Sequence, residues 1–85
     1  MEIIYSLKAI DDIQFWKRSG NKKIMSRISE IISSIEYDPF TGIGKPEPLK
    51  YDLSDCWSRR ITKEHRVVYR ITNKSVEIIS LRFHY

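Results

Sequence analysis

The chain has 85 residues, of which 41% are hydrophobic and 31% charged, a balance typical of a folded globular protein. This length allows one core, so we expect a single domain over residues 1–85. No apolar run approaches the ~20 residues that cross a bilayer, and the single cysteine, Cys56, excludes an internal disulfide framework. A reducing cytoplasm is therefore the expected location.

Fifteen Lys and Arg residues outweigh eleven Asp and Glu residues and give a formal net charge of +4. A basic balance in a small domain favours a polyanionic partner, most often a nucleic acid. The cations gather in the second half of the sequence, at Arg59, Arg60, Lys63, Arg66, Arg70, Lys74 and Arg82. We therefore expect the second half to build any phosphate-binding surface.

The N-terminal half is interpreted as one strand followed by two helices. Residues 2–5 are the expected strand, and Ser6 is the expected N-cap of a helix over 7–19. Gly20 ends this helix, and Asn21 caps the next one. The second helix has the clearest pattern, an apolar stripe at helical spacing formed by Ile24, Ile28, Ile31, Ile32 and Ile35. The short turn predicts an antiparallel helical hairpin.

A loop with a restricted backbone separates the helices from the rest of the chain. All three prolines and two of the three glycines fall within residues 39–48. Four strand-like runs follow, at 49–53, 57–62, 66–72 and 75–84. This order predicts an α+β fold in which the two N-terminal helices pack on one face of a mostly antiparallel sheet.

Alternation along the last two strands predicts which face each side chain takes. Two apolar sets are expected to meet the helices: Val67, Tyr69 and Ile71 on one strand, and Ile79, Leu81 and Phe83 on the last. The opposite parity carries three arginines and a histidine, which we expect on the uncovered face: Arg66, Arg70, Arg82 and His84. Such a basic open face suits a phosphodiester backbone.

Several kinds of active site find little support in the sequence. The two histidines, His65 and His84, do not fall in a metal-ligand spacing, so we expect no metal ion and no cofactor. Gly42 and Gly44 form a Gly-x-Gly pair without a strand–glycine–helix unit, which argues against a mononucleotide cradle. Cys56 is expected to be structural rather than a nucleophile.

The remaining constellation suits acid–base cleavage of RNA, whose own 2′-hydroxyl is the nucleophile. This reaction needs a base for the hydroxyl proton, a cation for the phosphorane and an acid for the leaving 5′-oxygen. Glu47, Arg66 and His84 have the required side chains. The ordinary alternative stays open, because a glutamate between prolines is usually a solvated loop residue and a penultimate histidine often lies in a frayed terminus.

Several blocks of the sequence, taken together, resemble a known family. The matching blocks are residues 44–50 (GKPEPLK), 57–62 (WSRRIT), 64–69 (EHRVVY) and 82–85 (RFHY), with Leu53-Ser54, Asp11-Asp12 and Trp16. They resemble the Txe/YoeB toxins of the RelE/ParE superfamily of bacterial toxin–antitoxin systems. The likeness runs along the whole chain, and the linked blocks make it specific.

The resemblance implies a compact, microbial-RNase-like α+β fold and an activity. Members of this family are messenger-RNA endonucleases that cut in the ribosomal A site and block translation. They are encoded beside a YefM/Phd-type antitoxin that inhibits the nuclease, and the toxin–antitoxin complex represses its own promoter by binding operator DNA. Members often form homodimers.

The resemblance also implies roles for particular residues. The family's general base falls on Glu47, its phosphate-stabilising arginine on Arg66 and its general acid on His84. The positions that contact substrate or surround the site are Tyr85, Lys50, Arg60, Arg59 and Glu64. Cys56 departs from the family, in which an aromatic residue is common at this position.

Two other functions stay open at the level of sequence. The first is a non-catalytic nucleic-acid-binding or repressor module on the same fold. The second, by analogy of fold alone, is a gyrase-poisoning toxin. The presence of Glu47, Arg66 and His84 in one chain favours the nuclease.

Overall fold

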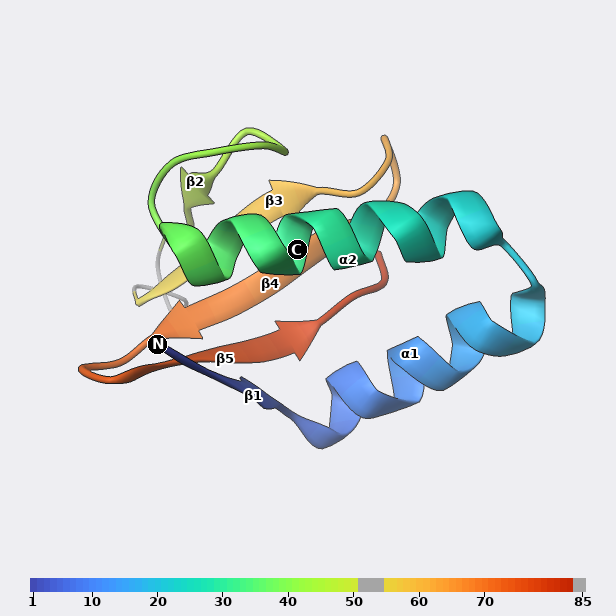
Figure 1. Ribbon diagram of the computed structural model, residues 1–85, viewed down its shortest axis with the longest axis horizontal. Helices are drawn as coiled ribbons and strands as arrows, with labels where there is room; N and C mark the ends of the chain where they lie inside the picture. Colours follow the sequence, from blue (N-terminus) through green and yellow to red (C-terminus); the bar gives the residue numbers. More distant parts are fainter. Residues whose placement is uncertain (51–54, 84–85) are drawn as a thin grey trace.

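The computed structural model describes residues 1–50 and 55–83, which form two helices and a five-stranded sheet (Figure 1). The elements are β1 (Glu2–Tyr5), α1 (Leu7–Ser19), α2 (Lys22–Tyr37), β2 (Glu47–Pro48), β3 (Cys56–Arg60), β4 (Arg66–Ile71) and β5 (Ser75–Ser80). The strand order is β1-β5-β4-β3-β2, with β1 parallel to β5 and the other pairs antiparallel. The predicted α+β class and the mostly antiparallel sheet are confirmed.

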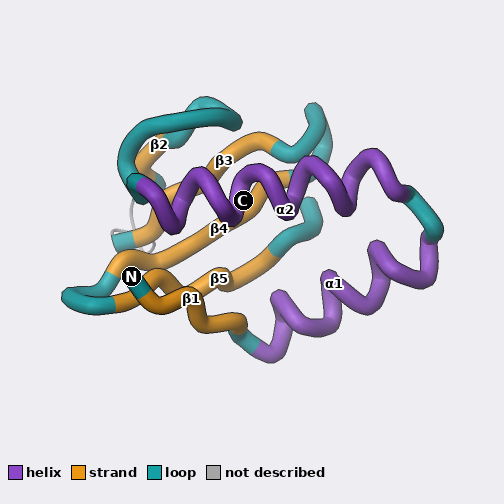
Figure 2. The backbone as a smooth tube through the Cα atoms, in the orientation of Figure 1, coloured by secondary structure: helices purple, strands orange, loops and turns teal. Residues whose placement is uncertain are grey.

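Both helices begin and end where the sequence predicts, with a short turn between them (Figure 2). Ser6 Oγ accepts a hydrogen bond from the Ala9 N–H at 3.0 Å, and Asn21 Oδ1 accepts one from the Ile24 N–H at 3.1 Å. These caps satisfy donors that the first turn of a helix leaves unpaired. Gly20 ends α1 with a φ of 71°, which glycine adopts without strain. Within the described ranges, neither helix is long and apolar enough to cross a membrane.

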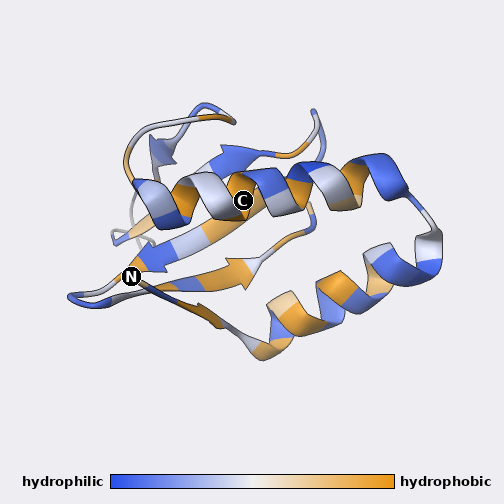
Figure 3. Cartoon of the chain, viewed as in Figure 1, coloured by the Kyte–Doolittle hydropathy of each residue, from blue (hydrophilic) through white to orange (hydrophobic). Residues whose placement is uncertain are grey.

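The core lies between α2 and the sheet. Ile28, Ile31 and Ile35 are the buried part of the predicted apolar stripe, and they pack against β4 and β5. Hydrophobic residues recur along α2 and on the strands behind it (Figure 3). Trp16 of α1 is 5% exposed and Tyr69 of β4 is fully buried, so the predicted core positions of both are confirmed.

The face alternation of β5 differs from the prediction. Ile78 packs into the core, whereas Ile79 does not belong to it. Tyr69 of β4 lies opposite Ile78, but the preceding residue, Val68, lies opposite Ser80. Ile79 is therefore an extra residue in the pairing, a bulge that moves the alternation by one position. The prediction that Ile79 faces the helices is wrong for this reason.

The last strand also ends earlier than the sequence predicts. β5 stops at Ser80, and Phe83 adopts a left-handed backbone with a φ of 64°. The Phe83 side chain is 54% exposed, so the prediction that it faces the core is wrong, whereas Leu81 is fully buried as expected. His84, predicted on this strand, lies outside the described residues, as do residues 51–53 of the predicted strand over 49–53.

Candidate functional site

The face of the sheet that points away from the helices carries the predicted base and the predicted phosphate-binding arginine. Residues directly opposite one another in neighbouring strands project from the same face. Glu47 lies opposite Ser58, and Arg66 lies opposite Arg60. Because Ser58 and Arg60 are two positions apart on β3, all four side chains share one face. The intervening Arg59 points toward the helices.

The register also sets the spacing between Glu47 and Arg66. They are separated by two strand spacings, roughly 10 Å across the sheet, and by one pleat repeat, about 7 Å along it. Glu47 is exposed and Arg66 is half-buried. Within residues 1–50 and 55–83, neither side chain takes part in an ion pair.

The loop after α2 positions Glu47 through a close approach to β3. The Arg60 N–H donates to the Gly44 carbonyl oxygen at 2.7 Å, and the Leu49 N–H donates to the Cys56 carbonyl oxygen at 2.8 Å. Gly44 has a φ of 84°, and a Cβ there would lie 3.2 Å from the Arg60 carbonyl oxygen. Glycine is therefore required both for the conformation and for the fit. Glu47 lies between these two anchor points.

Arg59 serves the fold rather than the site. It is fully buried, and all five of its N–H donors are used internally. Nε donates to the Tyr69 hydroxyl at 3.0 Å. The other four donate to Ser34 Oγ at 2.7 Å and to the carbonyl oxygens of Asp38, Thr41 and Ile43 at 2.7, 3.0 and 3.2 Å. The predicted substrate-binding role of Arg59 is wrong, because no donor remains for a phosphate.

Arg82 also departs from its predicted place. Its guanidinium carbon lies 3.5 Å from the centre of the Phe15 ring on α1 and 4.6 Å from the centre of the Phe83 ring. Guanidinium groups stack on aromatic faces in this way. Arg82 therefore contacts α1 instead of projecting from the uncovered face. The arginines that the register does place on that face are Arg60, Arg66 and Arg70.

Of the other predicted site residues, three are exposed and two lie outside the described residues. Lys50 is exposed two residues after β2, and Arg60 is exposed at the end of β3. Glu64 is exposed in the turn between β3 and β4, where its N–H donates to Thr62 Oγ1 at 3.1 Å. The predicted acid His84 and the predicted nucleotide-placing Tyr85 lie outside the described residues. The structure thus brings Glu47, Arg60 and Arg66 onto one face and places Glu64 on a turn.

Comparison with known proteins decides the family. Residues 5–85 match the family described as "YoeB-like toxin of bacterial type II toxin-antitoxin system". The chain belongs to this family. A Toxin YoeB of Escherichia coli O6:H1 is 48% identical to this toxin over 85 residues, which cover 100% of both sequences. The resemblance inferred from the sequence blocks is confirmed.

Solved structures support the same assignment. A YoeB/ParE toxin from Agrobacterium tumefaciens superposes with a TM-score of 0.94 at 44% identity, covering 100% of both chains. From Staphylococcus aureus, a YoeB dimer has a TM-score of 0.89 at 37% identity, and a YoeB–YefM complex has 0.87 at 38%. Each covers 100% of this chain and 98% of the other. The chain is thus a toxin of a type II toxin–antitoxin system, with a RelE-like fold.

A row of four side chains, one from each of four neighbouring strands, runs across the same face of the toxin. Glu47, Ser58, Val68 and Ser80 lie opposite one another in turn on β2, β3, β4 and β5. Ser58, Val68 and Ser80 are buried, at 6%, 1% and 1% exposure. The Ser80 hydroxyl has no hydrogen-bond partner among the described residues. Alternation along the strands predicts this face for Val68 and Ser80, and the register with the bulge at Ile79 puts the two residues opposite one another.

Two groups near the loop after α2 have shifted pKa values. The Asp38 carboxylate accepts hydrogen bonds from the Phe40 N–H and the Thr41 hydroxyl, both at 2.9 Å. These bonds, the Phe40 one first, hold the Asp38 pKa below its usual 3.8. Burial raises the pKa of Tyr69 above 10.0, although a hydrogen bond from Arg59 opposes this shift. Both groups stabilise the loop that leads to the site, and neither lies on the uncovered face.

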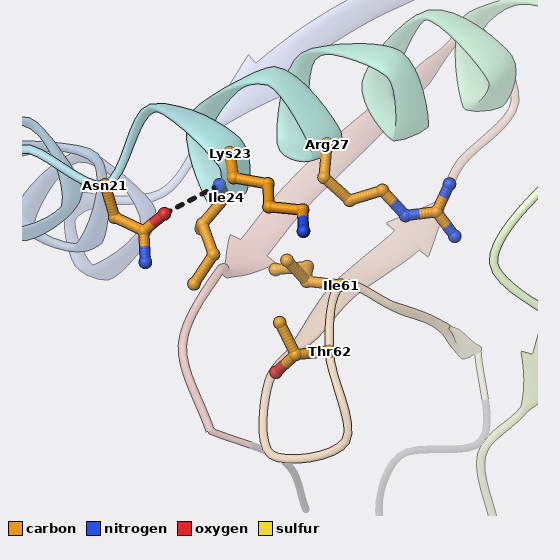
Figure 4. A pocket seen from close by; sticks show the side chains of 6 residues that line it. All are labelled: Asn21, Lys23, Ile24, Arg27, Ile61 and Thr62. Atoms are coloured by element: carbon orange, nitrogen blue, oxygen red, sulfur yellow. Dashed lines mark hydrogen bonds between the residues drawn. The ribbon is translucent and has the colours of Figure 1, made fainter.

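A pocket of about 390 Å³ lies away from this face, between the start of α2 and the residues that follow β3 (Figure 4). It is lined by Asn21, Lys23, Ile24, Arg27, Ile61 and Thr62. None of the residues predicted to bind or cleave RNA takes part in it. The sheet face with Glu47, Arg60 and Arg66 is therefore the better candidate site, because it holds the predicted base and the predicted phosphate-binding arginine.

Proposed function

We propose that this toxin is an endoribonuclease that cuts messenger RNA in the ribosomal A site and so inhibits translation. The observation that carries the proposal is the placement of Glu47 and Arg66 on the sheet face that points away from the helices, with Arg60 directly opposite Arg66. A carboxylate and two guanidinium groups then flank the space that a phosphodiester would occupy. The family membership supports the toxin role, and the face supports the nuclease chemistry.

The proposed reaction is an acid–base attack by the RNA on itself. Glu47 takes the proton of the 2′-hydroxyl, and the 2′-oxygen forms a bond to the adjacent phosphorus. Arg66 stabilises the negative charge that develops on the phosphorane oxygens. His84 gives a proton to the 5′-oxygen as the bond from phosphorus to that oxygen breaks. The products are a 2′,3′-cyclic phosphate and a 5′-hydroxyl, and no metal ion or cofactor takes part.

The remaining residues of the face have supporting roles in this proposal. Arg60 and Lys50 are exposed cations that contact RNA phosphates on either side of the reacting group. Tyr85 places a nucleotide, and Glu64 borders the site from the turn between β3 and β4. These contacts orient the RNA so that its 2′-hydroxyl, phosphorus and 5′-oxygen are in line.

We also propose that a YefM-type antitoxin neutralises the toxin, that their complex binds operator DNA and represses its promoter, and that the free toxin forms a homodimer. The Staphylococcus aureus relatives, which were solved as a YoeB dimer and as a YoeB–YefM complex, support the antitoxin and the dimer. A basic face offers charge complementarity to an acidic antitoxin segment, which inhibits by covering the face or displacing its residues.

The experiment that tests the nuclease is expression of the wild-type chain and of His84→Ala, without antitoxin, reading growth and messenger-RNA 3′ ends. The wild type is expected to arrest growth and to create new 3′ ends within codons, whereas His84→Ala should do neither. Glu36→Gln, an exposed position on α2, is the control that should behave as wild type. Growth arrest by wild type and His84→Ala alike, without new 3′ ends, would favour a non-catalytic function.

A further inference from the structure

Two side chains of α1 form hydrogen bonds with the backbone of Leu81, the residue that follows β5. The Leu81 N–H donates to Asp12 Oδ2 at 2.9 Å, and the Leu81 carbonyl oxygen accepts from Trp16 Nε1–H at 2.9 Å. Asp12 and Trp16 are four residues apart, so they lie on the same side of the helix. Both are nearly buried, at 4% and 5% exposure, and Lys8 pairs with the Asp12 carboxylate at 2.9 Å. Leu81 is thus held through both its backbone polar groups.

The backbone of Phe83 is also held by two hydrogen bonds, one with His65, just before β4, and one with Arg66, the first residue of β4. The Phe83 N–H donates to His65 Nδ1 at 2.9 Å, and the Phe83 carbonyl oxygen accepts from the Arg66 N–H at 2.9 Å. Because a backbone N–H can only donate, His65 Nδ1 is the acceptor and the ring is neutral in this arrangement. The His65 ring also packs edge-on against the Trp16 ring, with centroids 4.8 Å apart. The residues that hold Leu81 and those that hold Phe83 are therefore in contact through the Trp16 and His65 rings.

The backbone of Phe83 shows that these contacts impose a conformation. Its φ of 64° lies in the left-handed region, which bulky L-residues rarely adopt. Such a conformation persists only where the surroundings fix it, and the bonds from His65 and Arg66 do so here. The bend turns the chain at the residue that directly precedes His84. The same Arg66 whose side chain is proposed to stabilise the phosphorane supplies one of the two bonds through its backbone.

We infer that Asp12, Trp16 and His65 form a clamp that positions His84 and Tyr85 for the reaction. This inference rests on the proposed function, since it takes His84 as the general acid. The three residues are positioning residues, which act through the backbone of Leu81 and Phe83 and do not touch the RNA. A general acid must come within roughly 2.6–3.2 Å of the leaving oxygen, and a displacement of about 1 Å can cost 100-fold in rate. The clamp limits such displacement.

A matched pair of substitutions at His65 separates the clamp from simple packing. His65→Asn places an amide oxygen where Nδ1 accepts its hydrogen bond, whereas His65→Leu keeps an apolar side chain without an acceptor. The measurements are kcat and KM for cleavage of a single codon on programmed ribosomes, the melting temperature, and hydrogen exchange of the Phe83 amide.

We expect His65→Leu to lower kcat about 10- to 100-fold with little change in KM, and to speed exchange of the Phe83 amide. His65→Asn should restore most of the rate and of the amide protection. A purely structural role of His65 would instead lower the melting temperature and leave the kcat of the folded fraction unchanged. Should His65→Leu fail to fold, Trp16→Phe, which removes the indole N–H donor to Leu81 together with part of the buried ring, gives the comparison through the Leu81 contact.

Two results would overturn the clamp alone. One is wild-type kcat in a folded His65→Leu variant whose Phe83 amide exchanges faster, because the hydrogen bond between the Phe83 N–H and residue 65 would then be lost without effect on the reaction. The other is a loss of kcat that His65→Asn does not rescue, because the acceptor would then not be what matters. A folded wild-type chain that cuts no ribosome-bound RNA would overturn the proposed function, and the clamp's role in it. The wild-type reaction therefore distinguishes the two failures.

Discussion

The adjacent arginines Arg59 and Arg60 of β3 have different roles: Arg59 stabilises the fold, and Arg60 lies on the candidate site. Arg59 points into the molecule and uses all its donors on Tyr69 and on the segment from Ser34 to Ile43. Arg60 is exposed on the face that carries Glu47. The two side chains lie on opposite faces of the sheet because side chains alternate along a strand. Their substitutions should therefore affect different properties.

We expect Arg59→Lys to lower the free energy of unfolding by on the order of 3 kcal/mol. A lysine has three donors for the five acceptors that now surround the guanidinium, so buried carbonyl oxygens lose their partners. Arg60→Lys, the matched control, should stay within about 0.5 kcal/mol of wild type because its side chain is exposed. Urea unfolding measures both, and equal losses would contradict the roles assigned to the two arginines.

Glu47→Gln should abolish most of the reaction while leaving the fold intact. The substitution keeps the shape of the side chain but removes the base, which typically contributes ~100- to 10,000-fold. Stability should not change, because Glu47 is exposed and makes no ion pair within residues 1–50 and 55–83. Cleavage on programmed ribosomes and a thermal melt measure the two effects. A Glu47→Gln variant that cuts at the wild-type rate would remove Glu47 as the base.

At the scale of elements, local chemistry predicts the helices well and the register of the strands less well. The caps at Ser6, Gly20 and Asn21 are defined by residues within a few positions of them, so the bounds of α1 and α2 follow from sequence. The bulge at Ile79 depends instead on how β5 pairs with β4, which the sequence of β5 alone does not contain. The predicted position of Ile79 failed for that reason.

The candidate site, too, can be predicted from sequence only in part. Glu47 and Arg66 can be proposed from sequence, because acid–base chemistry needs those side chains and the family resemblance points to them. Their placement on one face depends on the register of β2 on β3, a contact between distant segments. The structural role of Arg59 could not be predicted, since its partners lie in a loop 16 to 21 residues away and on α2.

Gly44→Ala tests how the loop after α2 holds β2 in place. The variant should lose on the order of 2 kcal/mol of stability, because Gly44 has a φ of 84° and an added Cβ would crowd the Arg60 backbone at 3.2 Å. It should also lower the cleavage rate, since β2 carries Glu47. The control is Gly20→Ala, where φ is 71° but nothing lies within 4 Å of an added Cβ. It should cost about 1 kcal/mol and leave the cleavage rate unchanged.

A control that slowed cleavage as much as Gly44→Ala would show that loss of stability alone explains the effect. Urea unfolding and ribosome cleavage, measured on the same preparations, give both quantities. The two glycines share a left-handed backbone, and only at Gly44 would an added Cβ lie within 4 Å of other atoms.

Tyr69, which joins β4 to the loop after α2, should make the toxin less stable at alkaline pH. Its hydroxyl donates to the Pro39 carbonyl oxygen at 2.7 Å, and burial raises its pKa above 10.0. The folded state therefore keeps the proton longer than the unfolded state, so the stabilisation is complete below pH 10.0 and declines as pH rises through the folded pKa. Phenylalanine has no hydroxyl to titrate, so the free energy of unfolding of Tyr69→Phe should decline less over this pH range.

Urea midpoints between pH 8 and pH 11 measure the effect. Tyr69→Phe should already be less stable at the lower end of this range, because the Pro39 carbonyl oxygen and Arg59 Nε lose their partner. Parallel curves for wild type and Tyr69→Phe would contradict the raised pKa.

At the scale of the whole molecule, the fold separates stability from chemistry. α2 crosses one face of the sheet and α1 lies beside β5 (Figure 1), and both helices contribute to the core. The opposite face carries Glu47, Arg60 and Arg66. In the proposed function, the charged groups of this face contact the RNA backbone while the core stays on the other side of the sheet. The net charge of +4 attracts that backbone at long range and gives the encounter a dependence on salt.

The central claim is that the 2′-hydroxyl of the RNA attacks its own phosphate on this face, without a metal ion bound to the toxin. The most direct measurement uses ribosome-bound messages that differ only by one 2′-deoxyribose, placed immediately 5′ of the scissile phosphate. The wild-type toxin should cut the all-ribose message, leaving a 5′-hydroxyl and a 2′,3′-cyclic or 3′-phosphate, and should leave the deoxy message intact. Cleavage of the deoxy message would show that water attacks instead, and would contradict the account.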